Sequence, residues 1–136
     1  MLKLIVGKKG TGKTKLLVDG VNAAVANSKG NVICIEKGKK LTYDLTYRAK
    51  LIDIEEYQLS GYAQLYGFLA GLAAGNYDIT DIFVDGLFKF CPRDYDAMME
   101  FFGKIAHLTS SPHDVRFAFT VSADISELPE GVKDYL

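Results

Sequence analysis

Eight residues near the amino terminus, GKKGTGKT at 7–14, combine three glycines with three lysines directly after a short apolar run. Gly7, Gly12, Lys13 and Thr14 match the pattern G-x-x-x-x-G-K-[ST] at its full spacing. Glycines let successive backbone N–H groups turn inward into a concave anion nest, and a helix that begins there points its N-terminal dipole at the same place. A plain tight turn or a basic patch would also account for the composition, but the spacing predicts a loop that binds phosphate.

Each residue type in such a loop has its own task. Lys13 is expected to reach the β- and γ-phosphates and to act in catalysis, and the Thr14 hydroxyl is expected to ligate Mg²⁺. The residues expected to contact the nucleotide are Gly7, Lys8, Lys9, Gly10, Thr11, Gly12, Lys13, Thr14 and Lys15.

A magnesium ion bound to phosphate also needs a carboxylate at the carboxyl end of a neighbouring strand. The segment IFVD at 82–85 places Asp85 there, whereas Asp81 is expected at the entrance of the same strand. The alternative for Asp85 is a turn residue before Gly86, because Asp-Gly is a common turn pair. Thr14 and Asp85 are therefore the predicted metal ligands.

The loop requires a buried strand before it and a helix after it, and the sequence predicts both. Short apolar runs at 2–6, 31–36, 50–54, 79–85 and 116–122 are typical of strands buried on both faces. Helical spacing predicts helices over 13–27, 59–74 and 92–108, with one more short helix in the tail. The stripe expected to face the core from the first helix is Leu16, Leu17, Val21, Ala24 and Val25.

One further segment, residues 41–48, alternates apolar and polar side chains. That alternation predicts a half-exposed edge strand or hairpin arm with Leu41, Tyr43, Leu45 and Tyr47 on one face. Strands that alternate with helices predict an α/β fold of three layers, in which helices flank a mostly parallel sheet of about five strands. At 136 residues the chain is expected to form a single domain, 1–136.

The composition of the chain indicates the cellular compartment in which the protein is expected. An apolar fraction of 49% and a charged fraction of 24% are those of an ordinary globular protein. The opening apolar run is too short for a secretory signal, and the apolar stretch at 66–75 has about half the length needed to span a membrane. Two single cysteines favour a reducing environment. We therefore expect a cytoplasmic protein without membrane insertion.

Positive and negative side chains are distributed unevenly along the chain. Residues 1–50 hold eleven cations and three carboxylates, a net +8, and residues 51–136 hold five cations and fourteen carboxylates, a net −9. Such a split favours a polyanionic ligand, a protein partner or head-to-tail self-association, unless folding interleaves the halves and cancels the dipole. Arginine is scarce and no aromatic residue interleaves with Lys37, Lys39 and Lys40, which argues against nucleic acid as the ligand.

With these residues in place, the chain resembles a P-loop NTPase over nearly its whole length. An extra strand between the Walker A strand and the Walker B strand makes it similar to the additional-strand, RecA-like division. It also resembles short, uncharacterised bacterial P-loop ATP-binding proteins, some of which are labelled twitching-motility ATPase-like. The pilus-retraction ATPases themselves are longer and have acidic and histidine boxes for which this chain has no room.

The resemblance implies a water-activating glutamate. In RecA-like members this residue ends the strand after the P-loop helix, and Glu36 matches that position. Many relatives instead place it directly after the Walker B aspartate, where this chain has Gly86, and Glu55 and Glu56 are further candidates. A polar sensor residue would correspond to Ser122.

The resemblance also implies a ligand and an activity. The N-K-x-D motif of guanine-specific relatives is absent from the sequence, so ATP with Mg²⁺ is the expected ligand pair. The implied function is an ATP-binding protein with weak Mg²⁺-dependent ATPase activity, acting as a switch or as a regulatory or motor subunit. Arg93 or Arg116 could serve as an arginine finger for a second copy. Two alternatives remain open: a non-catalytic nucleotide-sensing module, and a small-molecule or nucleotide kinase, which the absence of an arginine-rich lid disfavours.

Overall fold

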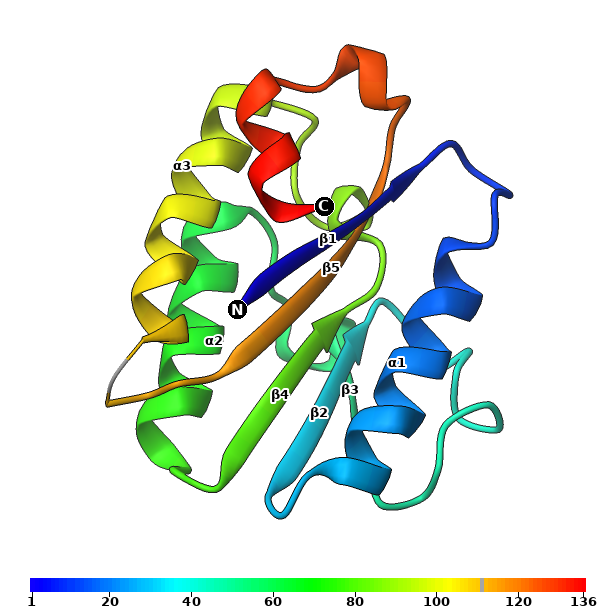
Figure 1. Cartoon of the computed structure of the whole chain (residues 1–136), viewed down its shortest axis with the longest axis vertical. Helices are drawn as coiled ribbons and strands as arrows, with labels where there is room; N and C mark the ends of the chain where they lie inside the picture. Colours follow the sequence, from blue (N-terminus) through cyan, green and yellow to red (C-terminus); the bar gives the residue numbers. More distant parts are fainter. Residues whose placement is uncertain (111) are drawn as a thin grey trace.

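A five-stranded sheet lies at the centre of the computed structural model, which describes residues 1–110 and 112–136. The strands are β1 (Leu2–Gly7), β2 (Asn31–Glu36), β3 (Lys50–Asp53), β4 (Ile79–Val84) and β5 (Arg116–Ser122). They are arranged in the order β1-β5-β4-β2-β3, and every neighbouring pair is parallel (Figure 1). The predicted α/β class and the predicted sheet of about five strands are confirmed.

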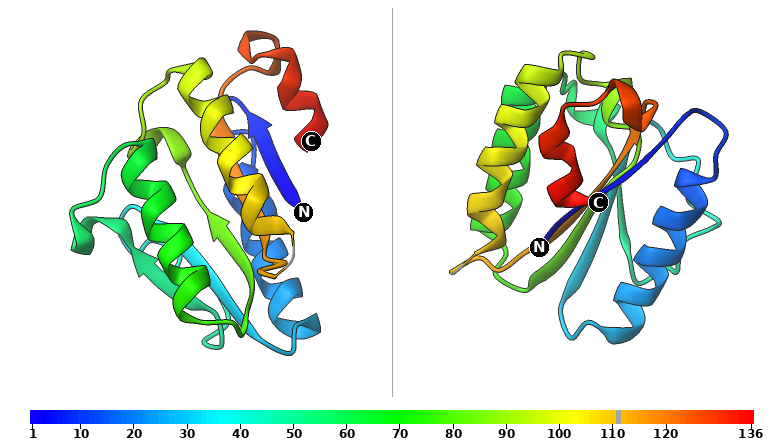
Figure 2. Two further views of the ribbon diagram at one scale, coloured as in Figure 1. Left: turned by 90° about the vertical axis from the view of Figure 1, so that its left-hand side faces the viewer. Right: turned by 45° about the horizontal axis from the view of Figure 1, so that its top comes forward.

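Helices cover both faces of the sheet. Helix α1 (Lys13–Asn27) packs on one face, and α2 (Tyr62–Gly75) and α3 (Tyr95–Ala106) pack on the other, together with the carboxyl-terminal 3-10 helix η5 (Glu130–Tyr135) (Figures 1 and 2). Four shorter 3-10 helices occupy connections: η1 (Ile54–Tyr57), η2 (Leu87–Lys89), η3 (His107–Thr109) and η4 (Ile125–Glu127). The result is the predicted arrangement of three layers.

The inner strands β2, β4 and β5 are mostly apolar because both of their faces are buried. Along β2, Ile33 and Ile35 belong to the core beneath α2 and α3, whereas Val32 and Cys34 belong to the core beneath α1. Successive strand residues point to opposite faces, so a strand covered on both sides shows an unbroken apolar run.

Helix α1 contacts the sheet through a narrower stripe than the sequence predicts. Leu17, Val21 and Val25 are buried at intervals of four residues, which lie on one helix face. Leu16 is 60% exposed, so its inclusion in the buried stripe was wrong.

The predicted strand at 41–48 is also wrong. Leu41 and Leu45 are buried against α1 in a turn, closed by a hydrogen bond from the Leu45 N–H to the Leu41 carbonyl (3.1 Å). Tyr43 and Tyr47 are 98% and 93% exposed. The leucines reach the core through their four-residue spacing rather than through two-residue alternation. The edge strands of the sheet are β1 and β3.

Helix boundaries differ from the prediction at three places. Helix α2 begins at Tyr62 rather than at residue 59. Helix α3 begins at Tyr95 rather than at residue 92, because the Asp94 carboxylate accepts a hydrogen bond from the Ala97 N–H (3.1 Å) as an N-cap. Helix α3 ends at Ala106, and the predicted continuation to residue 108 is the 3-10 helix η3.

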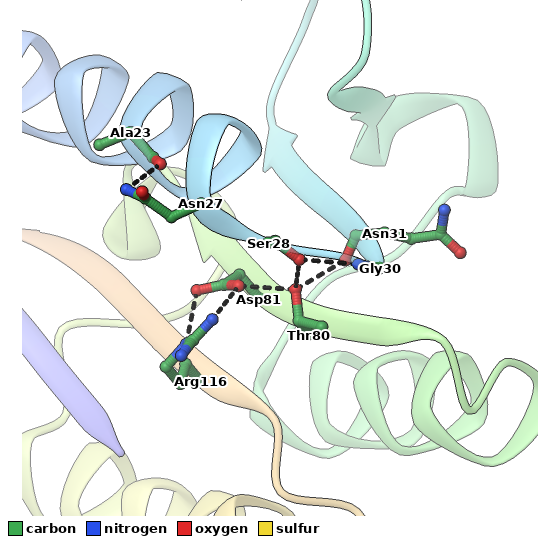
Figure 3. A network of polar contacts seen from close by, with 8 residues as sticks. All are labelled: Ala23, Asn27, Ser28, Gly30, Asn31, Thr80, Asp81 and Arg116. Carbon is green, nitrogen blue, oxygen red and sulfur yellow. Dashed lines mark hydrogen bonds and ion pairs between the residues drawn. The ribbon is translucent and has the colours of Figure 1, made fainter.

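A polar network joins the amino ends of the strands (Figure 3). Arg116 donates two hydrogen bonds to the Asp81 carboxylate, from Nε (3.0 Å) and Nη2 (2.9 Å), and the Thr80 hydroxyl donates a third (2.7 Å). The Ser28 hydroxyl contacts that of Thr80 and accepts the Gly30 N–H (3.0 Å). The network ties the end of α1 to the starts of β2, β4 and β5, and it places Asp81 at the strand entrance as expected.

Candidate functional site

The carboxyl ends of β1, β4 and β5 meet at one edge of the sheet because all strands run the same way. The segments that leave these strands enclose an open cleft of about 500 Å³, which we name the rim cleft. Its lining residues come from the glycine-rich loop and the start of α1, from the segment between β4 and α3 that includes η2, and from β5: Lys9, Gly10, Gly12, Lys13, Thr14, Asp85, Gly86, Phe88, Lys89, Arg93, Thr120 and Ser122. A cleft of this size is typical of small-molecule sites.

The glycine-rich loop owes its shape to backbone conformations that favour glycine. Gly10 (φ +82°) and Gly12 (φ +87°) are both in the left-handed region. The Lys8 carbonyl closes the loop by accepting hydrogen bonds from the Thr11 N–H (3.3 Å) and the Thr11 hydroxyl (2.7 Å). Helix α1 begins immediately afterwards, so its amino terminus points into the rim cleft.

Lys13 folds back over this loop. Its Nζ donates a hydrogen bond to the Lys8 carbonyl (2.8 Å), and the residue is only 8% exposed. Burial lowers the pKa of Lys13, the charge of Asp85 raises it, and the charge of Lys89 lowers it further. The ammonium is therefore held at the loop by one carbonyl, where an incoming phosphate oxygen would be a stronger acceptor.

Thr14 and Asp85, the predicted metal ligands, lie side by side. The Thr14 hydroxyl is 3.3 Å from Oδ1 and 3.4 Å from Oδ2 of Asp85. Thr120 on β5 donates to Asp85 Oδ1 (2.8 Å) and accepts the Gly86 N–H (2.6 Å), which orients the carboxylate. The sequence reasoning missed Thr120; its signal is a polar residue inside the apolar run 117–121 of β5.

This donor set suits magnesium. Mg²⁺ prefers oxygen ligands and is usually held by one or two protein oxygens together with phosphates and water. Among the described residues, no group of three or more histidine, cysteine or acidic side chains could hold a metal by itself. Thr14 and Asp85 could therefore hold the ion jointly with a bound polyphosphate.

Glu36, the predicted water-activating residue, does not line the rim cleft. It is 2% exposed, and its Oε2 accepts the Leu41 N–H (2.8 Å). Burial raises the pKa of this carboxyl, although the Leu41 hydrogen bond opposes the shift. In this structure Glu36 anchors the turn that follows β2.

The other acidic candidates, Glu55 and Glu56, and several lysines near the loop are held in ion pairs. Glu55 and Glu56 of η1 lie 3.9 Å from Lys37 and 3.0 Å from Lys39, respectively. Near the loop, Lys8 pairs with Asp124 (3.3 Å) and Lys15 with Asp19 (3.6 Å). Of the four lysines expected to contact the nucleotide, Lys8, Lys9, Lys13 and Lys15, the rim cleft is lined by Lys9 and Lys13.

Two cations that sequence reasoning did not place at the phosphates do line the rim cleft. Lys89 comes from the end of η2, and Arg93 from the turn before α3. Arg93 Nη1 donates to the Ser122 carbonyl (2.8 Å), and its guanidinium carbon lies 4.5 Å from the centroid of the Phe88 ring. Arg116, the other expected finger residue, is bound to Asp81 at the opposite end of the sheet.

Within the described part of the chain, the helices are too short or too polar to pass through a lipid bilayer. The chain matches no model of a known protein family and no curated protein sequence.

Proposed function

We propose that the chain binds Mg²⁺–ATP in the rim cleft and acts as a nucleotide-dependent switch with slow hydrolysis. One observation carries the proposal: a loop of P-loop spacing places Lys13 and Thr14 beside Asp85, which ends a strand distant in sequence. In this arrangement Lys13 would neutralise phosphate charge, the loop amides would bind phosphate oxygens, and Thr14 and Asp85 would hold Mg²⁺.

The order of the strands supports membership of the additional-strand, RecA-like P-loop NTPases. Strand β5 lies between β1, which precedes the loop, and β4, which ends before Asp85. Ser122, at the end of this inserted strand, lines the rim cleft at the position expected of a polar sensor residue.

We expect slow rather than rapid hydrolysis because of where the carboxylates of Asp85 and Glu36 lie. Asp85 is the single acidic residue among the described residues that line the rim cleft, and its proposed task is to hold the metal. Glu36 would have to release the Leu41 N–H before it could orient water. An enzyme with its base held elsewhere retains only the electrostatic part of catalysis.

Calorimetry on the purified protein tests the binding claim. ATP with Mg²⁺ should bind, and Lys13→Ala should weaken binding by at least about tenfold, because it removes a charge-assisted contact. Lys133→Ala, at an exposed lysine of η5, is the matched control and should leave affinity unchanged. Absence of heat from the unsubstituted protein with millimolar ATP or GTP would end the proposal.

A non-catalytic sensor is the second candidate, and the position of Glu36 favours it. A sensor needs the loop, Thr14 and Asp85, but it does not need a base. The rate of phosphate release from ATP distinguishes the switch with slow hydrolysis from the non-catalytic sensor. A rate that Glu36→Gln lowers supports the switch with hydrolysis, whereas a negligible rate that Glu36→Gln leaves unchanged supports the sensor.

A further inference from the structure

A side chain on the residue directly after Asp85 would strain the backbone and displace Lys89. Gly86 has φ +78°, and a Cβ at this position would lie 2.8, 3.1 and 3.2 Å from Cδ, Cε and Cγ of Lys89. The aliphatic stem of Lys89 thus folds back across Gly86 toward the rim cleft. The position at which a glutamate would follow the aspartate in many P-loop NTPases is covered here by a lysine.

The charge on the walls of the rim cleft is strongly positive. Lys9, Lys13, Lys89 and Arg93 face a single carboxylate, Asp85, among the described lining residues. The charge of Lys89 acts on both Lys13 and Glu36, and it lowers the pKa of each. Its ammonium group is therefore within electrostatic reach of the loop on one side and of the end of β2 on the other.

Arg93 also lines the rim cleft, and two contacts fix the position of its guanidinium group. One N–H group binds the Ser122 carbonyl, and the guanidinium lies over the Phe88 ring. A guanidinium has five N–H donors in a rigid plane, so this anchoring leaves donors for an anion. Stacking on an aromatic ring also reduces the rotamer freedom that binding would otherwise have to remove.

We propose that Lys89, with Arg93 beside it, contacts the terminal phosphate of the nucleotide, so that the chain distinguishes a triphosphate from a diphosphate with its own cations. This assignment rests on the proposed function. The terminal phosphate carries charge that a diphosphate lacks, and Lys89, whose stem lies over Gly86, adds to the rim cleft a cation that does not belong to the glycine-rich loop. An arginine finger from a second copy is then unnecessary.

The test compares two ligands on matched variants. Lys89→Met removes the charge but keeps most of the stem, and Lys29→Met removes an equivalent charge from an exposed turn far from the rim cleft. Calorimetry with Mg²⁺ and either a non-hydrolysable ATP analogue or ADP gives the ratio of the two affinities. Lys89→Met should lower triphosphate affinity by about ten- to a hundredfold and change ADP affinity by less than about threefold. Lys29→Met should change neither.

Lys89→Arg completes the series, because it keeps the charge and should retain most of the triphosphate preference. Equal losses for both nucleotides in Lys89→Met, or no loss for either, overturn the assignment and leave the proposed function intact. If the unsubstituted protein binds neither nucleotide, the proposed function and the assignment are overturned together.

A second measurement addresses the second copy. If the chain's own cations suffice, phosphate release per molecule should stay constant when the protein concentration is raised about a hundredfold across the micromolar range, since no encounter between copies is needed. A rate per molecule that rises with concentration, and that Lys89→Met leaves unchanged, contradicts the assignment.

Discussion

The hydroxyl of Thr14 lies 3.3 Å from the carboxylate of Asp85, although 71 residues separate them in the chain. The first belongs to the opening turn of α1 and the second follows β4, two strands away from β1 in the sheet. Thr120, on the strand between them, orients the carboxylate through its own hydroxyl. Two oxygen donors are thus already held together, which would lower the entropic cost of binding the proposed magnesium ion.

Asp85→Asn should uncouple ATP binding from magnesium. With Mg²⁺ present, ATP affinity should fall by at least about tenfold, because an amide is a weaker ligand for a hard cation. With magnesium chelated, affinity should equal or exceed that of the unsubstituted protein, because a negative charge near the phosphates has been removed. Titration calorimetry with and without chelator measures both values.

Asp134→Asn, at an exposed position of η5, provides the matched control and should behave as the unsubstituted protein in both conditions. Equal loss of affinity with and without magnesium would show that Asp85 supports the shape of the rim cleft rather than holding an ion.

Glu36→Gln should change how stability depends on pH. The folded-state pKa of Glu36 is raised by burial, so the stability that its bound proton contributes is complete below the ordinary glutamate pKa of about 4.3. That contribution is lost as the pH rises through the raised folded-state pKa. Glutamine has no such proton and can still accept the Leu41 N–H through its amide oxygen.

The free energy of unfolding in urea, measured from about pH 4 to pH 8, should therefore decline less in Glu36→Gln than in the unsubstituted protein, since the titration contributes only to the latter. Glu100→Gln, on the exposed face of α3, should follow the unsubstituted protein. Parallel curves for all three proteins would show that Glu36 titrates alike in the folded and unfolded states.

Elements whose signal is local could be read from the sequence. Apolar runs such as 31–36 and 116–122 indicate strands that are buried on both faces. The glycine-rich loop is predicted by the spacing of its glycines, Lys13 and Thr14. The position of Asp85 at the end of a strand follows from the apolar run 82–84 that precedes it. Each of these features depends on residues within a few positions of one another, which is the range that periodicity and motif spacing cover.

Features that depend on tertiary contacts could not be read in this way. The leucines of 41–48 are buried because the segment turns against α1, where Asn22 donates to the Asp44 carbonyl (3.1 Å) and accepts the Thr46 N–H (2.9 Å). An eight-residue alternation does not encode those partners. The roles of Lys89 and Arg93 likewise depend on how η2 lies over the ends of the strands.

Arg116→Met should destabilise the fold without affecting the rim cleft. Asp81 is 5% exposed and would lose both hydrogen bonds from the guanidinium, which leaves a buried carboxylate with fewer donors. The expected cost is about 1–3 kcal/mol, below that of a fully buried pair because the Arg116 side chain is 51% exposed. Chemical denaturation measures this cost.

Arg116→Met/Asp81→Asn should recover part of the loss, since the unpaired charge is gone. ATP affinity should stay within about twofold of the unsubstituted protein in both variants, because the pair lies at the amino ends of the strands. A large change in ATP affinity would mean that the two ends of the sheet are coupled.

Gly86→Ala and Gly67→Ala should change stability in opposite directions. A Cβ at Gly86 meets the Lys89 stem at 2.8 Å on a backbone with φ +78°, so alanine should cost about 1–3 kcal/mol from backbone strain alone. Gly67 lies on the exposed side of α2 with open space around it, so alanine should stabilise by about 0.4–1 kcal/mol by restricting the unfolded chain. Thermal and urea unfolding compare the two variants directly.

Because the added methyl group displaces Lys89, Gly86→Ala should also reduce the preference for triphosphate over diphosphate, which Gly67→Ala should leave unchanged. A Gly86→Ala protein as stable and as selective as the unsubstituted one would mean that Lys89 does not depend on the bare backbone beside Asp85.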